Sequence, residues 1–433
     1  MRVFSIGLLV WLSCTVQANS LELLKIYRHL HQNPELSYQE KETAKFLATT
    51  LESLDYEVHT GIGGHGVVAL LKNGDGPTVM IRADMDALPV KEQTGLPFAS
   101  QKTVIQPDGQ KVSLMHACGH DVHMTVLIGV AEHMAKHRSE WHGTLMLIGQ
   151  PAEERGGGAK AMLADGLFER FPRPDYNLAL HDSASLPAGS IGYTAGYALA
   201  SVDSIDIDVF GLGGHGAYPH RTKDPVVLAS RLVVDLQTII SREINPIEPA
   251  VLTVGSIHGG TKHNIIPDRV HLQLTLRAYS KIVRNQIIEA LKRLATGLAI
   301  SAGLPKDRMP VVTVQEDEYT PSTYNHPQLV DFAINTWQHA LNDVVIKSVP
   351  PVMGGEDFGR FGAVSPHIPS FIFWLGAVPQ AQWEKAQQGQ STLPSLHSPF
   401  WAPDAKTAIP VGVKAMTVLA KQLFEKQPKF SAN

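Results

Sequence analysis

The chain has 433 residues, of which 44% are hydrophobic and 18% charged, and its formal net charge is −4. This balance is typical of a globular protein with room for two or three domains. Nothing in this charge balance points to nucleic acid, so we expect no nucleic-acid partner.

The N-terminal residues have the composition of a secretory signal peptide. Arg2 is followed by an apolar run, Val3–Leu12, which is too short to span a bilayer, and then by Val16-Gln17-Ala18, a small-residue cleavage pattern. We therefore expect cleavage after Ala18, export to the periplasm or the medium, and no integral membrane segment in the mature chain. The alternative is a disordered or buried N-terminal segment.

Cys118 is the cysteine that would remain after cleavage, because the other one, Cys14, lies in the leader. A mature exported chain with one cysteine cannot form an internal disulfide, and its thiol would be open to oxidation unless something occupied it. Only Gly119 separates Cys118 from His120, so the backbone can bend and the two side chains can point the same way. The pattern indicates a metal site, although a buried thiol beside a surface histidine has the same pattern.

Short apolar runs predict buried strands that alternate with helices, at residues 67–71, 78–82, 145–149 and 177–180. Side chains suited to metal sites follow three of these strands directly: Asp84, Asp86, Glu153, Glu154 and His181. In open α/β sheets, ligands bind in the crevice outside the carboxyl ends of the strands. We therefore expect these side chains to converge with Cys118 and His120.

Several of these residues have alternative interpretations. Asp84 and Asp86 could orient metal-bound histidines or cap a turn before Pro89. Of the paired glutamates, one could bind metal while its neighbour handles a proton. Asp121 is a candidate N-cap for a helix over residues 122–138. We interpret the histidines on or near this helix as surface or packing residues: His123, His133 and His137.

The pattern changes between residues 187 and 318. Strands at 204–209 and 271–276 alternate polar and apolar residues strictly, as half-exposed antiparallel strands do. Two helices and two further strands complete a β-α-β-β-α-β order, which predicts a ferredoxin-like α+β domain. The buried-strand pattern returns after residue 319. We therefore expect a signal peptide (1–18) and a mixed-sheet α/β catalytic domain in two parts (19–186 and 319–433), with the ferredoxin-like domain (187–318) inserted between them.

A match that runs from about Arg28 to Pro403 includes eight ordered sequence blocks: Arg28–Ser37, Arg82–Pro89, Met115–Asp121, Gln150–Glu154, Gly213–His220, Asn264–Asp268, Gly354–Phe358 and His397–Pro399. Together they resemble the aminoacylase, hippurate hydrolase and auxin-conjugate amidohydrolase branch of the dinuclear metallopeptidases, which also include carboxypeptidase G and succinyl-diaminopimelate desuccinylase. The resemblance implies a zinc-peptidase-like catalytic domain whose inserted domain is a lid and often mediates homodimer formation.

For the site, the resemblance implies two divalent metal ions per subunit, held by Cys118, His120, Glu154, His181 and His397. Thiolate and imidazole ligands favour zinc, with manganese dependent on availability and cobalt or nickel as further candidates. The resemblance also implies Glu153 as general base and His215 as stabiliser of the oxyanion. It implies that Asn264 and Arg277 hold a substrate carboxylate, although Arg277 could equally lie on a solvated strand face. His220 and Glu356 are interpreted as structural.

The implied activity is hydrolysis of the amide bond of small-molecule N-acyl amino acids, of the hippurate or N-acetyl type. A metallo-carboxypeptidase or dipeptidase acting on short peptides would use the same site. A periplasmic binding protein that had lost catalysis would lack a ligand or the base, and this chain lacks none of them. Two departures from the family pattern leave the substrate open: Asp182-Ser183-Ala184 after His181, and a longer loop from Gln101 to Leu114.

Overall fold

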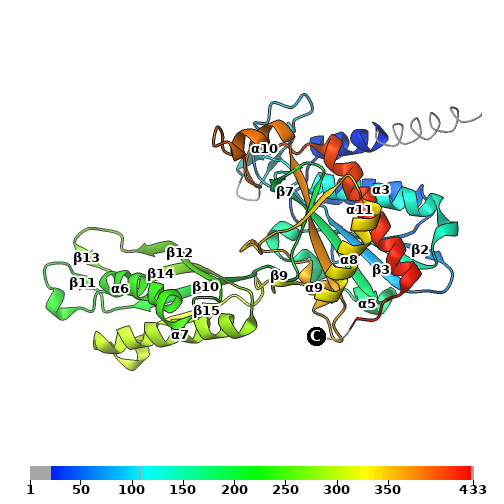
Figure 1. Cartoon of the computed structure of the whole chain (residues 1–433). Coiled ribbons are helices and arrows are strands. Elements are labelled where there is room, and N and C mark those ends of the chain that lie inside the picture. The colour runs from blue at the N-terminus through cyan, green and yellow to red at the C-terminus, as the bar shows by residue number, and fades with distance from the viewer. Residues whose placement is uncertain (1–20, 107–108, 431–433) are drawn as a thin grey trace, which may run out of the picture. The chain divides into compact units, whose positions relative to one another are not determined.

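The computed structural model describes residues 21–106 and 109–430, which form two compact units (Figure 1). Unit 1 comprises the chain up to Gly196, the segment Tyr324–Pro350 and the chain from Phe358 onward, and unit 2 comprises Tyr197–Thr323 and Pro351–Asp357. The predicted signal peptide lies outside the described residues. None of the described helices combines the length and the apolar character that crossing a membrane requires.

An eight-stranded mixed sheet is the centre of unit 1, which confirms the predicted α/β class. Its strands lie in the order β1 (Glu57–Ile62), β2 (Gly66–Asn73), β6 (Gly143–Gln150), β3 (Thr78–Asp84), β7 (Tyr176–Pro187), β18 (Ser370–Val378), β8 (Ser190–Tyr193) and β17 (Val345–Ser348). β3 pairs in parallel with both β6 and β7. Every residue of β3 is buried, as expected for a central parallel strand. The carboxyl ends of β3, β6 and β7 therefore meet at one edge of the sheet.

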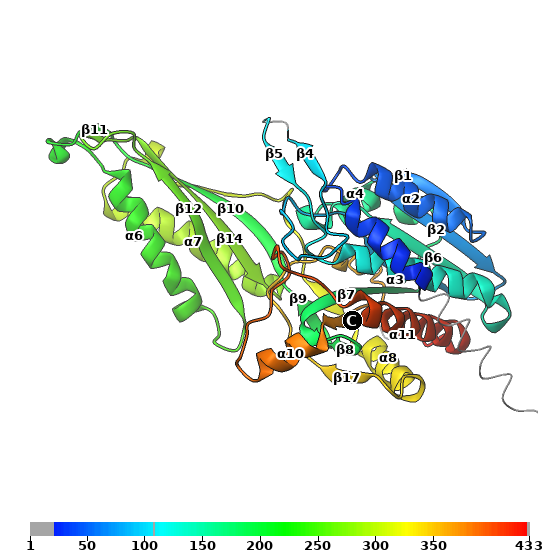
Figure 2. The same ribbon diagram turned by 90° about the horizontal axis from the view of Figure 1, so that it is seen from above.

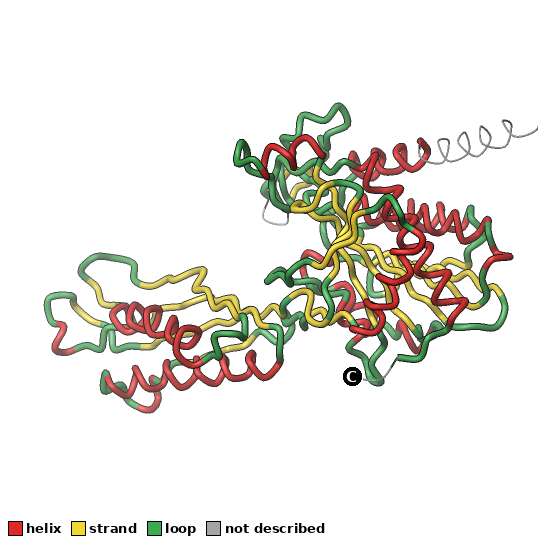
Figure 3. Tube along the Cα trace, in the orientation of Figure 1, coloured by secondary structure: helices red, strands yellow, loops and turns green. Residues whose placement is uncertain are grey.

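Helices pack on this sheet (Figures 2 and 3). They are a helix over residues 21–32, α2 (Lys41–Glu52), α3 (His120–Lys136), α4 (Gly158–Ala164), α5 (Leu167–Arg170), α8 (Pro327–Ala340), α9 (Gly359–Gly362), α10 (Gln380–Gln387) and α11 (Ala405–Lys426). α3 and α11 lie side by side, and both contact β3. The first three turns of α3 are buried on every side. Polar side chains in those turns therefore need partners inside the protein.

The predicted N-cap of this helix is wrong. α3 begins at His120, and the capping position belongs to Gly119, whose φ of 75° lies in the left-handed region that glycine adopts readily. Asp121 lies in the first turn, where its Oδ2 is 2.7 Å from Nδ1 of buried His31. A buried carboxylate is most stable when hydrogen bonded, and pairing with His31 supplies that bond.

Unit 2 contains the predicted β-α-β-β-α-β order: β10 (Ser201–Phe210), α6 (Pro225–Thr238), β12 (Ala250–Gly259), β14 (Arg269–Ala278), α7 (Lys281–Ser301) and β15 (Val311–Val314). The strands form an antiparallel sheet in the order β12-β14-β10-β15. Burial alternates strictly along β10, and the buried face packs on α6 and α7 to form a core of its own. The ferredoxin-like prediction is therefore confirmed.

Strand pairing places the limits of the inserted unit. β8 falls within the predicted range 187–318, yet it pairs with β17 and β18 in the large sheet of unit 1. Unit 2 starts at Tyr197 and includes a short return segment, Pro351–Asp357. Within the long loop of residues 101–114, β4 (Thr103–Ile105) and β5 (Lys111–Ser113) form a small hairpin.

Candidate metal centre

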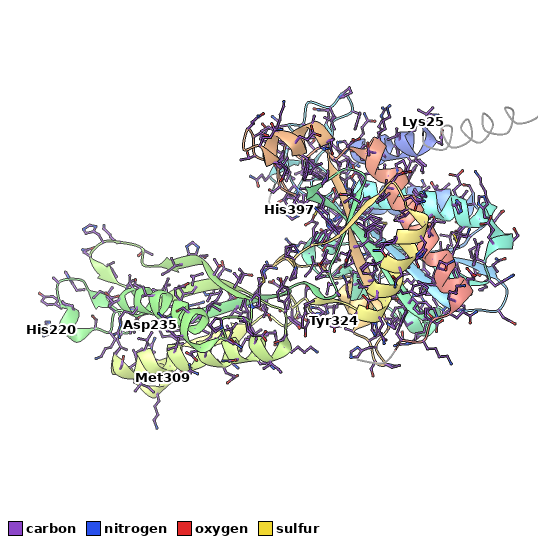
Figure 4. All side chains as sticks on the ribbon, viewed as in Figure 1. Lys25, His220, Asp235, Met309, Tyr324 and His397 are labelled. Carbon is purple, nitrogen blue, oxygen red and sulfur yellow. The ribbon has the colours of Figure 1, made fainter. Side chains whose placement is uncertain are left out.

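The ends of three neighbouring strands and the start of α3 bring the predicted residues of unit 1 together. Asp84 ends β3, the Glu153–Glu154 pair follows β6 in a short 3-10 turn, and His181 lies on β7. Cys118 and His120 lie at the entry to α3. His397 comes from the loop that precedes α11, at a positive φ of 66° (it is labelled in Figure 4).

The distances show that these side chains form one cluster. Sγ of Cys118 lies 3.2 Å from Nε2 of His397 and 3.6 Å from Nε2 of His181. Three overlapping sets have ligand atoms within 4.8 Å of one another: Cys118, His120 and His181; Cys118, Glu154 and His397; and His120, Glu153 and Glu154. The three sets share members, so together they join all five predicted ligands and the predicted base in one cluster. A distant His397 or His181 would have excluded the site, and neither is distant.

Several polar atoms at the centre of this cluster make no hydrogen bond within the described part of the chain, although carboxylates lie near them. Both ring nitrogens of His120 and Oε1 of Glu154 are buried without a hydrogen bond. Burial raises the pKa of Glu154 to about 7, against the lowering effect of His120. Burial, together with the Glu154 carboxylate, also raises the pKa of the Cys118 thiol. A bound divalent cation would reverse both shifts and give the unpartnered atoms a partner. The thiol, imidazole and carboxylate donors therefore fit divalent metal ions such as zinc.

Asp86 and Asp84 surround the cluster. Asp86 accepts hydrogen bonds from the backbone N–H groups of Glu153 (3.1 Å) and Glu154 (3.0 Å) and from the Ser37 hydroxyl (2.6 Å). Asp84 accepts a hydrogen bond from Arg82 Nη1 at 2.7 Å, and its Oδ2 lies 3.7 Å from Nε2 of His120. Both aspartates thus contact the candidate site itself, which is more than capping the turn before Pro89.

His123 is a residue of the site that the sequence analysis missed. It is 2% exposed, and its Nδ1 lies 2.6 Å from Oδ1 of Asp84. The backbone N–H of Asp182 donates to its Nε2 at 2.9 Å. This contact favours a neutral ring that donates through Nδ1, although the nearby carboxylates of Asp84 and Asp182 favour the charged form. The signal was its position: three residues after His120, His123 lies on the same side of the helix.

Asp182, one of the two departures from the family pattern, also belongs to the site. Its Oδ2 accepts a hydrogen bond from Trp401 Nε1 at 3.1 Å, and its backbone carbonyl oxygen lies 2.8 Å from Nδ1 of His181. The latter contact fixes the tautomer, because Nδ1 carries the proton and Nε2 keeps a free lone pair facing Cys118. A Cβ at Gly119 would lie 2.2 Å from Oδ2 of Asp182, so only glycine fits there.

The predicted oxyanion stabiliser, His215, and the two residues predicted to bind substrate, Asn264 and Arg277, lie in unit 2. His215 is in β11 (Gly214–His215), which pairs with β13 (Ile265–Ile266), and both His215 and Asn264 are exposed. The backbone carbonyl of Asn264 accepts a hydrogen bond from Gly216 at 2.9 Å, so these two segments are neighbours. Arg277 is on β14 and is partly buried, and burial lowers its pKa. His220, labelled in Figure 4, is exposed.

Comparison with known proteins gives consistent results. Residues 80–391 match Peptidase family M20/M25/M40. N-acetyldiaminopimelate deacetylase of Leuconostoc citreum is 37% identical over 363 residues, which is 82% of this chain and 89% of the relative. Hippurate hydrolase of Campylobacter jejuni is 38% identical over 345 residues, covering 78% and 85% respectively.

A solved structure extends the likeness to three dimensions. The Bacillus subtilis YXEP protein, described as a dinuclear metal-binding peptidase of the M20 family, is 31% identical and has a TM-score of 0.76. The alignment covers 94% of this chain and 99% of that one. The chain therefore belongs to Peptidase family M20/M25/M40, and it is a metal-dependent hydrolase of amide bonds that uses two divalent ions.

Proposed function

We propose that this protein hydrolyses the amide bond of N-acyl amino acids, of the N-acetyl or hippurate type. The observation that carries the proposal is the cluster in unit 1, where Oε2 of Glu153 lies 3.9 Å from Nε2 of His120 beside a donor set that fits two divalent cations. The substrate class is supported by relatives that are named for N-acetyldiaminopimelate and hippurate.

The residues that we assign to the two ions are Cys118, His120, Glu154, His181 and His397. Zinc is the metal we propose, because thiolate and imidazole ligands favour it, and manganese is the alternative. When bound, such ions polarise a carbonyl and lower the pKa of water from 15.7 to roughly 7 in the best-studied case. Replacing Cys118 with Ser should lower the metal-to-protein ratio by elemental analysis, and an unchanged ratio would remove Cys118 from the ligand set.

Glu153 is the residue that we assign to proton transfer. It accepts a proton from the water that attacks the acyl carbon and returns it to the amine nitrogen as the C–N bond breaks. Its neighbour in the chain is the proposed ligand Glu154, and both backbone N–H groups are held by Asp86. The two carboxylates therefore keep a fixed relation to each other while taking different roles.

Substrate binding is assigned to unit 2. A partly desolvated guanidinium gains much from a bidentate carboxylate partner, which supports Arg277 as the group that binds the amino acid carboxylate. Following the family resemblance, Asn264 binds the same carboxylate and His215 stabilises the oxyanion.

Export and homodimer formation are also part of the proposal. β12 is an edge strand of the unit 2 sheet, and its Ile257 is 48% exposed, which supports unit 2 as the dimer surface. The protein recovered outside the cytoplasm is expected to begin at Asn19, which N-terminal sequencing would show. Light scattering is expected to give twice the mass of the mature chain.

A substrate screen on metal-reconstituted protein tests the activity. Hippurate, N-acetyl amino acids and unblocked dipeptides are assayed side by side, with chelated protein as control. Higher kcat/KM on the N-acyl amino acids is expected. Preference for dipeptides would replace the proposal by a dipeptidase or carboxypeptidase, and absence of turnover on every substrate would overturn it.

A further inference from the structure

The turn that carries Glu153 and Glu154 has an unusual backbone. Ala152, directly before them, has φ 50° and ψ 40°, in the left-handed region that is unfavourable for a residue with a Cβ. The backbone N–H groups of Gly157 and Gly158 both donate to the Ala152 carbonyl. A strained conformation of this kind persists only where the surrounding structure holds it.

Two carboxylates hold this turn through three successive backbone N–H groups. Asp86 accepts those of Glu153 and Glu154, as described above. The N–H of Ala152 donates to Oε1 of Glu40 at 2.7 Å, and the same oxygen accepts the N–H of Tyr38 at 3.0 Å. Glu40 is 0% exposed, so water cannot replace it as acceptor.

The segment that contains Glu40 contacts both the Ala152 N–H and the second carboxylate, Asp86. Ser37, three residues earlier, donates its hydroxyl proton to Asp86 at 2.6 Å. Residues 37–40 therefore contact the Ala152 N–H through Glu40 and the acceptor of the next two N–H groups through Ser37. Nothing in the chemistry assigned so far uses Glu40.

We propose that Glu40 is a positioning residue: its Oε1 holds the Ala152 N–H and thereby sets where Glu153 and Glu154 point. The inference rests on the proposed function, since it concerns the placement of the proposed base and of a proposed metal ligand. It predicts that kcat and metal affinity depend on the position of the Oε1 acceptor and not on the negative charge of Glu40.

Two further observations support the view that Glu40 can act as a hydrogen-bond acceptor without being ionised. Oε2 of Glu40 is buried with no hydrogen-bond partner in the described chain. Burial, and then the Asp86 carboxylate, raise the pKa of Glu40 to about 7. A glutamine keeps Oε1 in place without the charge. An aspartate keeps the charge but is one methylene shorter, about 1.5 Å, so it does not reach Ala152.

The experiment compares Glu40→Gln with Glu40→Asp. We expect Glu40→Asp to lower kcat about 100-fold with KM nearly unchanged, because misplacement by about 1 Å costs that much. Glu40→Gln should stay within about threefold of the wild type by the same reasoning. The matched control is Glu35→Asp, because Glu35 lies in the same segment but accepts the N–H of Thr43, at 2.8 Å, and not that of the turn. This control should retain wild-type kcat.

Metal affinity gives a readout that does not depend on turnover. Zinc is titrated into protein that a chelator has freed of metal. The zinc affinity of Glu40→Asp should be about tenfold weaker than that of the wild type, because Glu154 lies on the same turn. The zinc affinity of Glu40→Gln should be close to that of the wild type. If the wild type binds zinc but hydrolyses no N-acyl amino acid, the proposed function fails while this ranking still decides the role of Glu40. Wild-type kcat and affinity in folded Glu40→Asp would overturn the inference, and so would a Glu40→Gln variant as impaired as Glu40→Asp.

Discussion

The two units differ in how their charged residues are paired and buried. In unit 2, Asp208 pairs with Arg269 and His271 on the half-exposed sheet face, and Asp203 pairs with Arg284. In unit 1, the thiol of Cys118 and the two ring nitrogens of His120, which make no hydrogen bond in the described chain, are buried among carboxylates. The charges of these unit 2 pairs are balanced by the chain itself, whereas in unit 1 only some of the carboxylates have a cationic partner, such as Arg82 beside Asp84, and the donor set fits added cations. This difference separates the part that holds the metal from the part assigned to the substrate, and single substitutions can test it.

The largest effect is expected at Glu153. Glu153→Gln removes the proton acceptor, so kcat should fall about 10³-fold or more. Metal content by elemental analysis should stay at that of the wild type, because Glu153 is not among the proposed ligands. Turnover near the wild-type rate would show that another group takes the proton.

The free energy of unfolding should depend on pH through the ionisation of Glu40. Its pKa in the folded protein, about 7, lies above its ordinary value of 4.5, so between these values the folded state binds more protons than the unfolded state. Stability contributed by this group is full below pH 4.5 and is lost as pH rises through 7, by at most about 3 kcal/mol. Glu40→Gln cannot ionise, so its free energy of unfolding should rise relative to the wild type between pH 5 and pH 8. Urea unfolding of metal-free protein measures this difference, and parallel curves would contradict it.

A substitution at His123 tests the support behind the metal ligands. His123→Phe keeps a flat ring, somewhat larger than imidazole, but removes both the hydrogen bond to Asp84 and the acceptor for the Asp182 N–H. Metal affinity, measured by titration, should fall about 10- to 100-fold. His133→Phe is the matched control, because His133 lies further along the same helix and stacks on His137. Equal affinities in the two variants would leave His123 with a packing role only.

The smallest effect is expected in unit 2. Arg277→Lys keeps the charge but loses the planar fork, so KM should rise about tenfold with kcat nearly unchanged. Metal content should not change. Arg269→Lys, on the same strand, is the control and should leave KM alone, since Arg269 already pairs with Asp208. A rise in KM only in the control would reassign the carboxylate-binding group.

Much of this molecule could be predicted from its sequence, because the informative patterns are local. Apolar runs located β3, β6 and β7, and the rule that ligands gather at the carboxyl ends of such strands placed Glu154 and His181 together. The strict alternation predicted for residues 204–209 is the burial pattern of β10. These features depend on neighbours in the sequence.

The residues that the sequence analysis assigned wrongly or missed have one thing in common: their hydrogen-bond partners lie far away in the sequence. Asp121 was predicted as a cap because its pairing with His31, 90 residues earlier, is invisible locally. His123 was assigned to the surface or to packing because its two partners come from other strands. Glu40 was not considered, since its acceptor role concerns a backbone N–H 112 residues away. Hydrogen bonds from distant side chains to backbone groups leave no local pattern of residue types, unlike helix caps.

The separation of Cys118 and His397 by 279 residues has a consequence for how the protein matures. The last side chain of the cluster becomes available only when nearly the entire polypeptide has been synthesised and the final part of the large sheet has closed on the first. Metal uptake is thus a late event, coupled to the completion of folding. A chain that ends before residue 397 would lack both this side chain and α11, whose buried face belongs to the core of unit 1.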